Sequence, residues 1–145
     1  KRQVLTESNA TSSVGKLLPE LAGKLTGNSI RVPVPNVSMA ILNLTVEETT
    51  TRETVCDFLR DCSLNSAMQR QIDYTESSEV VSSDFVGNRH ACIIDGHATI
   101  VNGQQMVLYV WYDNEFGYSC QVVRCAQKMA GIHYPLVPKQ PASAE

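Results

Sequence analysis

The sequence predicts an α+β domain in which an antiparallel sheet is covered on one face by helices. Strand-like runs follow one another along the chain and are joined by turn residues, while segments with helical spacing are interspersed between them. The composition, 43% hydrophobic and 19% charged, is typical of a globular protein. Because 145 residues is the size of one domain, we expect a single sizeable core.

A short helix is the first predicted element. Its apolar positions recur at i, i+3, i+4 and i+7 and are Val14, Leu17, Leu18 and Leu21. Pro19 is expected to end or bend this helix, because proline disrupts helical hydrogen bonding. Gly23, Gly27 and Asn28 then predict a turn.

A long strand is expected after this turn. Pro33 and Pro35 exclude regular pairing at its start. From Val37 both faces are apolar until Asn43, and beyond that point apolar and polar residues alternate. The pattern predicts a half-covered strand.

A helix is predicted next, from about Thr51 to Leu64. Thr50 and Glu53 have the spacing of a capping box, which is a signal for a helix N-terminus. Behind them the apolar residues repeat at helical intervals.

The second half of the chain begins with three short strand-like runs, EVVSSDFV, HACIID and ATIV. Asn102-Gly103 is a hairpin-turn signal, and it leads into QQMVLYVWYD, the most apolar strand of the chain. These runs complete the expected sheet.

The last helix is expected to begin near Asn114 or Glu115. One face of it carries Tyr118, Val122, Ala126 and Met129. We expect Phe116 and Tyr118 to open a helix that packs on the preceding strand. Residues 133–145 are Pro-rich and give no reason for order.

The charge balance excludes some partners. A net charge of −3 disfavours nucleic acid and anionic membrane surfaces, which require concentrated Lys and Arg. The sequence shows no apolar run of transmembrane length and no signal peptide, so we expect a soluble, cytoplasmic protein. The chain begins at Lys1 without an initiating Met, which suggests a piece of something larger.

The five cysteines predict free thiols and no metal site. Their number is odd and none forms a CxxC pair, so neither a disulfide framework nor a zinc site is indicated. Cys120 lies in the first turns of the last predicted helix and is a mild candidate for reactivity, although an inert thiol is the simpler interpretation. His90, His97 and His133 lie apart and are interpreted as surface or structural residues.

Arg31 is the strongest candidate for anion binding. It stands at the mouth of a strand, ahead of two prolines that stiffen the backbone. A rigidly held guanidinium is suited to bidentate capture of phosphate or carboxylate. The local pattern leaves open that Arg31 is an ordinary surface residue.

A family resemblance adds to this reading. It rests on three stretches, which are GKLLPELAGKLTGNSIRVPVPNVSMAILNLTV, EVVSSDFVG and WYDNEFGYS. Together, and in the right order from about Thr6 to Ala130, they resemble the catalytic-domain half of phosphorylating glyceraldehyde-3-phosphate dehydrogenases. The resemblance implies that residues 1–132 are part of the catalytic domain, that 133–145 are a tail, and that the N-terminal NAD-binding domain is absent. The missing glycine-rich strand-turn-helix signature agrees with the last point.

The resemblance also implies what chemistry is missing. In this family a Cys thiolate attacks the aldehyde, hydride passes to the nicotinamide, and inorganic phosphate cleaves the thioester with help from a His. The Ser-Cys-Thr-Thr-Asn string that carries this nucleophile does not occur in these 145 residues. No catalytic residue is therefore assigned, and we expect the chain alone to be inactive and not to bind NAD or NADP tightly.

Some binding roles carry over residue by residue. Arg31, in IRVP, matches the Arg that binds substrate or inorganic phosphate. Asn114, in YDNE, matches the Asn that holds the nicotinamide carboxamide, and Tyr118 matches an aromatic beside the ring. Ser8 falls where a Thr donates its hydroxyl to phosphate, and Asn9 replaces a Gly. With Glu7 adding negative charge, this departure suggests a weakened phosphate pocket.

Alternatives remain open. The erythrose-4-phosphate dehydrogenase branch has the same fold and chemistry. A non-catalytic oligomerisation module is a second possibility, since the family forms tetramers in which the sheets of the catalytic domains meet. The choice between NAD and NADP depends on a residue of the absent domain.

Overall fold

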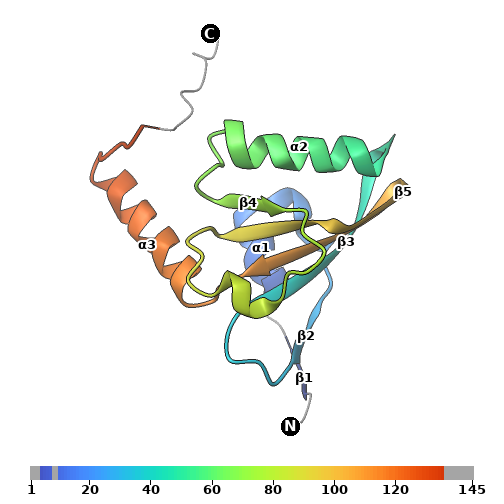
Figure 1. Ribbon diagram of the computed structural model, residues 1–145, viewed down its shortest axis with the longest axis horizontal. Coiled ribbons are helices and arrows are strands. Elements are labelled where there is room, and N and C mark those ends of the chain that lie inside the picture. Colours follow the sequence, from blue (N-terminus) through green and yellow to red (C-terminus); the bar gives the residue numbers. More distant parts are fainter. Residues whose placement is uncertain (1–3, 8–9, 136–145) are drawn as a thin grey trace, which may run out of the picture. The chain divides into compact units, whose positions relative to one another are not determined.

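The computed structural model describes residues 4–7 and 10–135 and divides the chain into two compact units, Lys1–Pro35 and Asn36–Glu145 (Figure 1). The first unit contains a pair of antiparallel strands, β1 (Val4–Glu7) and β2 (Asn28–Arg31). Between them lie a helix, α1 (Ala10–Leu17), and a short 3₁₀ turn, η1 (Pro19–Leu21). The helix ends at Leu17, two residues before the proline that was expected to end or bend it. The strands β1 and β2 were not predicted.

The second unit is built around a sheet with strand order β3-β5-β4. Its elements are β3 (Ser38–Thr50), α2 (Arg52–Asn65), β4 (Ile72–Thr75), η2 (Ser82–Phe85), β5 (Cys92–Tyr112) and α3 (Phe116–Met129). β3 pairs antiparallel to β5, and β4 pairs parallel to it. The α+β class is confirmed, and the sheet is mixed because of β4.

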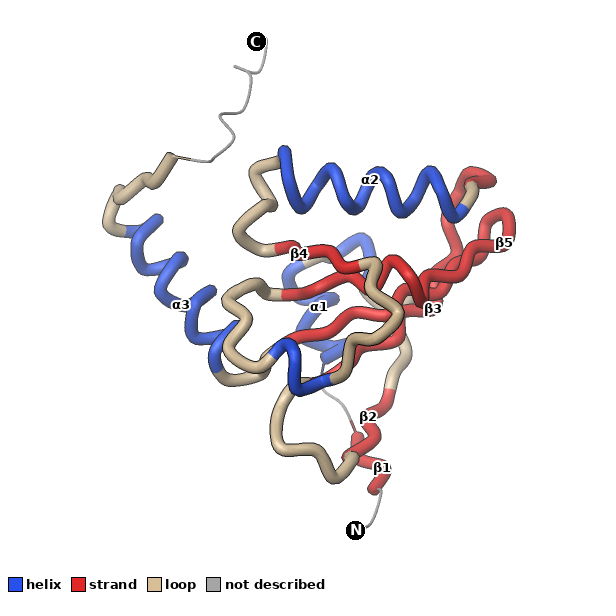
Figure 2. Tube along the Cα trace, in the orientation of Figure 1, coloured by secondary structure: helices blue, strands red, loops and turns tan. Residues whose placement is uncertain are grey.

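The long strand β5 folds back on itself at the expected Asn102-Gly103 turn. Gly103 has φ 63°, a left-handed conformation that glycine adopts readily. The Trp111 indole donates a hydrogen bond to the Asp95 carboxylate at 3.1 Å, across 16 positions of sequence. Figure 2 shows the segment doubling back at its far end, so residues 92–101 and 104–112 act as two arms.

Two predictions in the middle of the chain are wrong. The run EVVSSDFV does not form a strand, because the Asp84 carboxylate accepts a hydrogen bond from the Val81 backbone N–H at 2.8 Å and initiates the 3₁₀ turn η2. β4 occupies a stretch for which no strand was predicted. Its residues Ile72 and Tyr74 pack against the core, so tertiary contacts override the polar local sequence.

The cap of α2 lies one residue later than expected. Thr51, not Thr50, is the N-cap, and its side chain accepts a hydrogen bond from the Thr54 backbone N–H at 3.2 Å. The helix then packs on the sheet through Val55, Cys56 and Leu59.

Each face of the β5 hairpin carries buried residues. One face holds the main core cluster, composed of Ile94, Met106, Leu108 and Val110, under α2. The opposite face holds Ile93, which packs with Val37 and Phe85. The Phe85 and Trp111 rings stack with centroids 5.3 Å apart. Burial on both faces fixes the register of this hairpin, since a slip of one residue would exchange the two faces.

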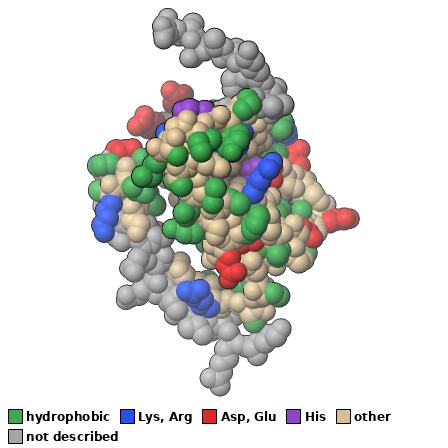
Figure 3. Space-filling view, turned by 90° about the vertical axis from the view of Figure 1, so that its left-hand side faces the viewer, with side chains coloured by type: hydrophobic (Ala, Val, Ile, Leu, Met, Phe, Trp, Pro, Cys, Tyr) green, Lys and Arg blue, Asp and Glu red, His purple; other side chains and the backbone are tan. Residues whose placement is uncertain are grey.

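The α3 helix is the exception to this close packing. It begins at Phe116, and Gly117 is its only buried residue. Phe116 and Tyr118 are 50% and 68% exposed, so the expectation that the helix they open packs on the preceding strand is wrong. Figure 3 views the side of the molecule that carries α3 and shows hydrophobic side chains on the surface.

Candidate functional site

The candidate site is the corner between the end of β5 and the start of α3. β5 ends at Tyr112, which pairs with Ser38 of β3, and α3 begins at Phe116. Between them, Asp113 is 2% exposed, whereas Asn114 and Glu115 are exposed. The corner therefore buries one carboxylate and presents the next side chain to solvent.

Asp113 receives hydrogen bonds from three separate segments. Its Oδ1 accepts from the backbone N–H groups of Glu115 and Phe116, at 2.9 and 2.8 Å. Its Oδ2 accepts from the Gly87 backbone N–H at 2.9 Å and from the Asn36 side-chain amide at 3.3 Å. The first pair caps the start of α3, and the second pair ties the corner to two loops.

These donors lower the pKa of the Asp113 carboxyl. The Gly87 N–H is the largest cause, opposed by burial, and the Phe116 and Glu115 N–H groups and the Asn36 amide add to the lowering. Each donor stabilises the ionised form more than the neutral form. The carboxylate is therefore charged at neutral pH and can hold all four donors.

The two predicted cofactor residues lie at this corner. Asn114 directly follows Asp113, and Tyr118 lies in the first turn of α3. Both side chains are exposed and available to a ligand. The structure thus brings Asn114 and Tyr118 to one end of one helix, and their roles as cofactor contacts stay predictions.

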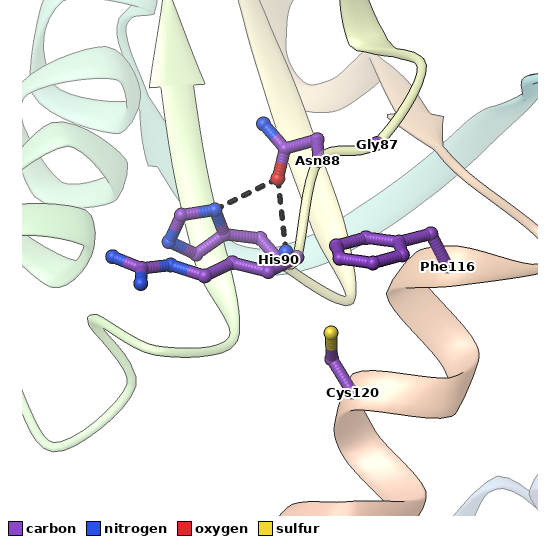
Figure 4. Close-up of a pocket in the computed structure, with 6 residues that line it drawn as sticks. Gly87, Asn88, His90, Phe116 and Cys120 are labelled. Carbon is purple, nitrogen blue, oxygen red and sulfur yellow. Dashed lines mark hydrogen bonds between the residues drawn. The ribbon is translucent and has the colours of Figure 1, made fainter.

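A hollow of about 360 Å³ adjoins the corner. Its lining comes from the loop after η2 and from α3, and comprises Gly87, Asn88, Arg89, His90, Phe116 and Cys120 (Figure 4). The loop and the helix approach closely at Gly117. A Cβ at this position would lie 2.7 Å from the His90 carbonyl oxygen. Only glycine fits at this point without displacing the loop backbone.

The loop beside the hollow is held by its own side chains. Asn88 Oδ1 accepts from the His90 backbone N–H at 2.9 Å and lies 2.8 Å from His90 Nδ1. Because this oxygen is an acceptor, a hydrogen bond at this contact requires a proton on Nδ1. Asp73 Oδ2 accepts from Asn88 Nδ2 at 3.2 Å. These contacts agree with the interpretation of His90 as a structural residue.

Arg31 belongs to the first unit. It is the last residue of β2, where pairing with Val4 fixes its backbone, and it is exposed. A backbone hydrogen bond from Val34 N–H to the Val32 carbonyl, 2.9 Å long, tightens the chain just after it. The role of Arg31 in anion capture stays a prediction. Ser8 and Asn9, the other predicted phosphate residues, lie outside the described residues.

Other expectations concern thiols, metals and membranes. All five cysteines lie within the described residues and are unpaired, as predicted. Across residues 4–7 and 10–135 there is no group of three or more His, Cys, Asp or Glu residues arranged to hold a metal ion. Within the same described part, no helix combines the length and apolarity needed to cross a bilayer.

Sequence reasoning missed the partners that hold the corner. Asn36 is 77 positions from Asp113, and Gly87 is 26 positions away, so local patterns could not connect them. Gly87 carried a weak signal, since glycine after an apolar run suggests a special backbone conformation, and its φ is 80°.

Residues 4–114 match the family described as "Glyceraldehyde 3-phosphate dehydrogenase, C-terminal domain", and the chain belongs to this family.

Relatives support this assignment. The chain is 58% identical over 136 residues to a "Glyceraldehyde-3-phosphate dehydrogenase-like protein" of Pseudomonas aeruginosa, covering 94% of this chain and 30% of that protein. It is 46% identical over 129 residues to "Glyceraldehyde-3-phosphate dehydrogenase" of Borreliella burgdorferi, covering 86% and 37%. It is 43% identical over 126 residues to "Glyceraldehyde-3-phosphate dehydrogenase, cytosolic" of Chlamydomonas reinhardtii, covering 86% and 36%. The chain thus spans about a third of these relatives.

Proposed function

We propose that this chain is the later part of the catalytic domain of a phosphorylating glyceraldehyde-3-phosphate dehydrogenase. In the complete enzyme, glyceraldehyde 3-phosphate, NAD and phosphate would yield 1,3-bisphosphoglycerate and NADH in the cytoplasm. The observation that carries the proposal is the corner at Asn114. The exposed Asn114 amide directly follows the Asp113 carboxylate, which is buried and accepts four hydrogen bonds. Its family membership supports the same reading.

Each binding residue has a proposed role. Arg31 binds the phosphate of the substrate or inorganic phosphate, since its guanidinium is exposed on a paired strand. Asn114 offers its side-chain amide to the nicotinamide carboxamide, and Tyr118 lies beside the ring. The cofactor is NAD or NADP, and the nucleotide itself would be held by a domain outside these 145 residues.

The chain alone is proposed to be inactive, because its sequence lacks the family's nucleophile string. The test joins this chain to the preceding segment of the Borreliella burgdorferi relative, which is named a glyceraldehyde-3-phosphate dehydrogenase. NADH formation is then measured for the chain alone and for the chimera. We expect turnover only in the chimera. In the chimera that carries Arg31→Ala, we expect either no turnover or a higher KM for phosphate. A folded chimera that binds NAD without turnover contradicts the proposal.

The same chimera distinguishes the enzyme branches. Initial rates with glyceraldehyde 3-phosphate and with erythrose 4-phosphate give the ratio of kcat/KM for the two aldehydes. We expect the triose phosphate to be preferred, whereas preference for the tetrose phosphate would favour the erythrose-4-phosphate dehydrogenase branch.

The segment around Ser8 is proposed to weaken the second phosphate site. A chimera with Ser8→Thr and Asn9→Gly restores the residues found elsewhere in the family. We expect a lower KM for inorganic phosphate with little change in kcat. An unchanged KM would refute this assignment.

A second candidate function is assembly through the sheet, which one observation favours. Met39, Ile41 and Ile100 are 38%, 55% and 54% exposed although they lie in strands. Exposed apolar side chains on a sheet are candidates for contact with another copy, as in a tetramer. Sedimentation of the chain over a range of concentrations should show self-association, and Ile41→Lys should abolish it. A monomer at all concentrations would remove this candidate.

A further inference from the structure

We propose that Asp113 is a positioning residue that fixes Asn114 in the orientation needed to meet its ligand. This inference rests on the proposed role of Asn114 and adds a residue whose own side chain does not touch the cofactor. It follows from the geometry of the corner, where one buried carboxylate joins the start of α3 to two distant loops.

The two carboxylate oxygens have separate tasks. Oδ1 faces the helix and accepts from Glu115 N–H and Phe116 N–H. Oδ2 faces away from the helix and accepts from Gly87 N–H and Asn36 Nδ2. A neutral amide cannot perform both tasks, because its nitrogen would face donors on one side.

Asn114 is therefore fixed from both of its neighbours. On the N-terminal side, the pairing of Tyr112 with Ser38 holds the chain in the sheet. On the C-terminal side, the hydrogen bonds from Glu115 and Phe116 to Asp113 hold the first turn of α3. Since the backbone is restrained at 112, 113 and 115, little rotation is left for residue 114.

The Oδ2 contacts set where this corner lies relative to the rest of the unit. Gly87 belongs to the loop that lines the hollow next to α3, and Asn36 precedes β3. Gly117 also lies close to the His90 carbonyl, so the helix cannot move nearer to the same loop at this point. An exposed side chain on a backbone that is held by buried polar contacts is the arrangement expected of a preorganised binding group.

A purely structural role for Asp113 makes a different prediction. Removing a buried hydrogen-bonding group destabilises a protein wherever it lies. If Asp113 is a positioning residue, its removal must also disturb Asn114. That disturbance must be larger than the one caused by a substitution elsewhere that lowers the stability by the same amount. The test therefore compares variants of Asp113 with a core variant of similar stability.

The variants separate the two oxygens. Asp113→Asn keeps one acceptor oxygen and places its amide nitrogen against one of the two pairs of donors, either Glu115 and Phe116 or Gly87 and Asn36. Asn36→Ala removes one donor to Oδ2 and leaves Asp113 intact. Asp113→Ala removes both sets of contacts. Ile93→Val, in the core on the covered face of the sheet, is the matched control for lost stability.

The measurement uses the full 145-residue chain and NMR of its backbone and side-chain amides. In Asp113→Asn we expect the backbone amides on one side of the side chain, either Gly87 or the pair Glu115 and Phe116, to exchange about tenfold faster, with the other side changing less than about threefold. The order parameter of Asn114 should fall in Asp113→Asn, fall further in Asp113→Ala, and stay at the wild-type value in Ile93→Val. An Asn114 order parameter that is unchanged in Asp113→Asn, or equally lowered in Ile93→Val, overturns the inference.

A titration with NAD of the chimera that carries the Borreliella burgdorferi segment separates this inference from the proposed function. In the wild-type chimera, a shift of the Asn114 side-chain amide supports its role as a nicotinamide contact, and we expect that shift to need roughly tenfold more NAD in Asp113→Asn, since misplaced groups can lose up to about a hundredfold. If the wild-type chimera binds NAD without a shift at Asn114, the cofactor assignment fails, while the order parameters alone decide the role of Asp113. A shift with equal affinity in both chimeras overturns the positioning role.

Discussion

The helices α2 and α3 differ in packing although each has 14 residues and an apolar face. α2 buries Cys56 to 3% exposure, packs Val55 and Leu59 on the sheet, and donates from Arg52 to the Gly96 carbonyl at 2.6 Å. α3 buries only Gly117, and its apolar positions remain at the surface. An amphipathic pattern therefore predicts that a face can be covered, and it does not say what covers it.

The largest expected effect lies under α2. Leu108→Ala removes a side chain that is 7% exposed at the centre of the main cluster, and we expect it to lower the free energy of unfolding by about 2–5 kcal/mol. Urea denaturation followed by circular dichroism measures the change. Val122→Ala, at a position of α3 that is 50% exposed, is the matched control and should cost far less. Equal losses in the two variants would show that the helices do not differ as described.

A second effect comes from the close approach of Tyr74 to the backbone of β5. A Cβ at Gly96 would lie 2.0 Å from the Tyr74 hydroxyl oxygen and 2.4 Å from the ring carbon that bears it, so Gly96→Ala must displace the ring. We expect a loss of about 1–3 kcal/mol in the free energy of unfolding.

A double-mutant cycle identifies the cause of that loss. Tyr74→Ala removes the obstructing ring, so Gly96→Ala should cost less in that background than in the wild-type chain. If the cost of Gly96→Ala is the same in both backgrounds, the ring is not the reason for glycine at this position.

The corner before α3 should respond to pH. Hydrogen bonds, chiefly from Gly87 N–H, hold the Asp113 pKa below its ordinary value of 3.8. The stability contributed by the carboxylate is thus fully present above that value and is lost as the pH falls through the lower folded-state pKa. We expect wild type to exceed Asp113→Asn by about 1–2 kcal/mol at neutral pH.

Urea denaturation of both proteins from neutral to strongly acidic pH measures this difference directly. The gap should stay constant down to about pH 5 and narrow below about pH 4, because only the wild-type residue titrates. A gap that is independent of pH would show that ionisation of Asp113 does not stabilise the corner.

The sequence predicted those features that depend on neighbouring residues. The α+β class, the turn at Asn102-Gly103 and the helix that starts near Thr51 follow from spacing, propensity and capping, all of which are local. β4 was missed because its strand character depends on parallel pairing with β5, which brings together Ile72 and Cys92. The partners of Asp113 were missed for the same reason.

The candidate site divides in a similar way. Asn114 and Tyr118 were singled out because the WYDNEFGYS segment resembles a family motif. Their shared position at the start of α3 follows from the short spacing between them. The exposure of the α3 apolar residues could not be predicted, because periodicity assigns residues to a face and carries no information about the partner of that face.

The smallest expected effect tests the exposed side of α3. Met129 is 89% exposed, so Met129→Lys replaces an apolar side chain that makes few contacts and should change the free energy of unfolding by less than about 0.5 kcal/mol. The same substitution in the chimera with the Borreliella burgdorferi segment should cost more if that segment covers the helix. A loss above about 1 kcal/mol in the chain alone would mean that Met129 is already covered, because surface substitutions rarely reach that size. The comparison between α2 and α3 would then describe two packed helices, and the apolar face of α3 would need no partner outside this chain.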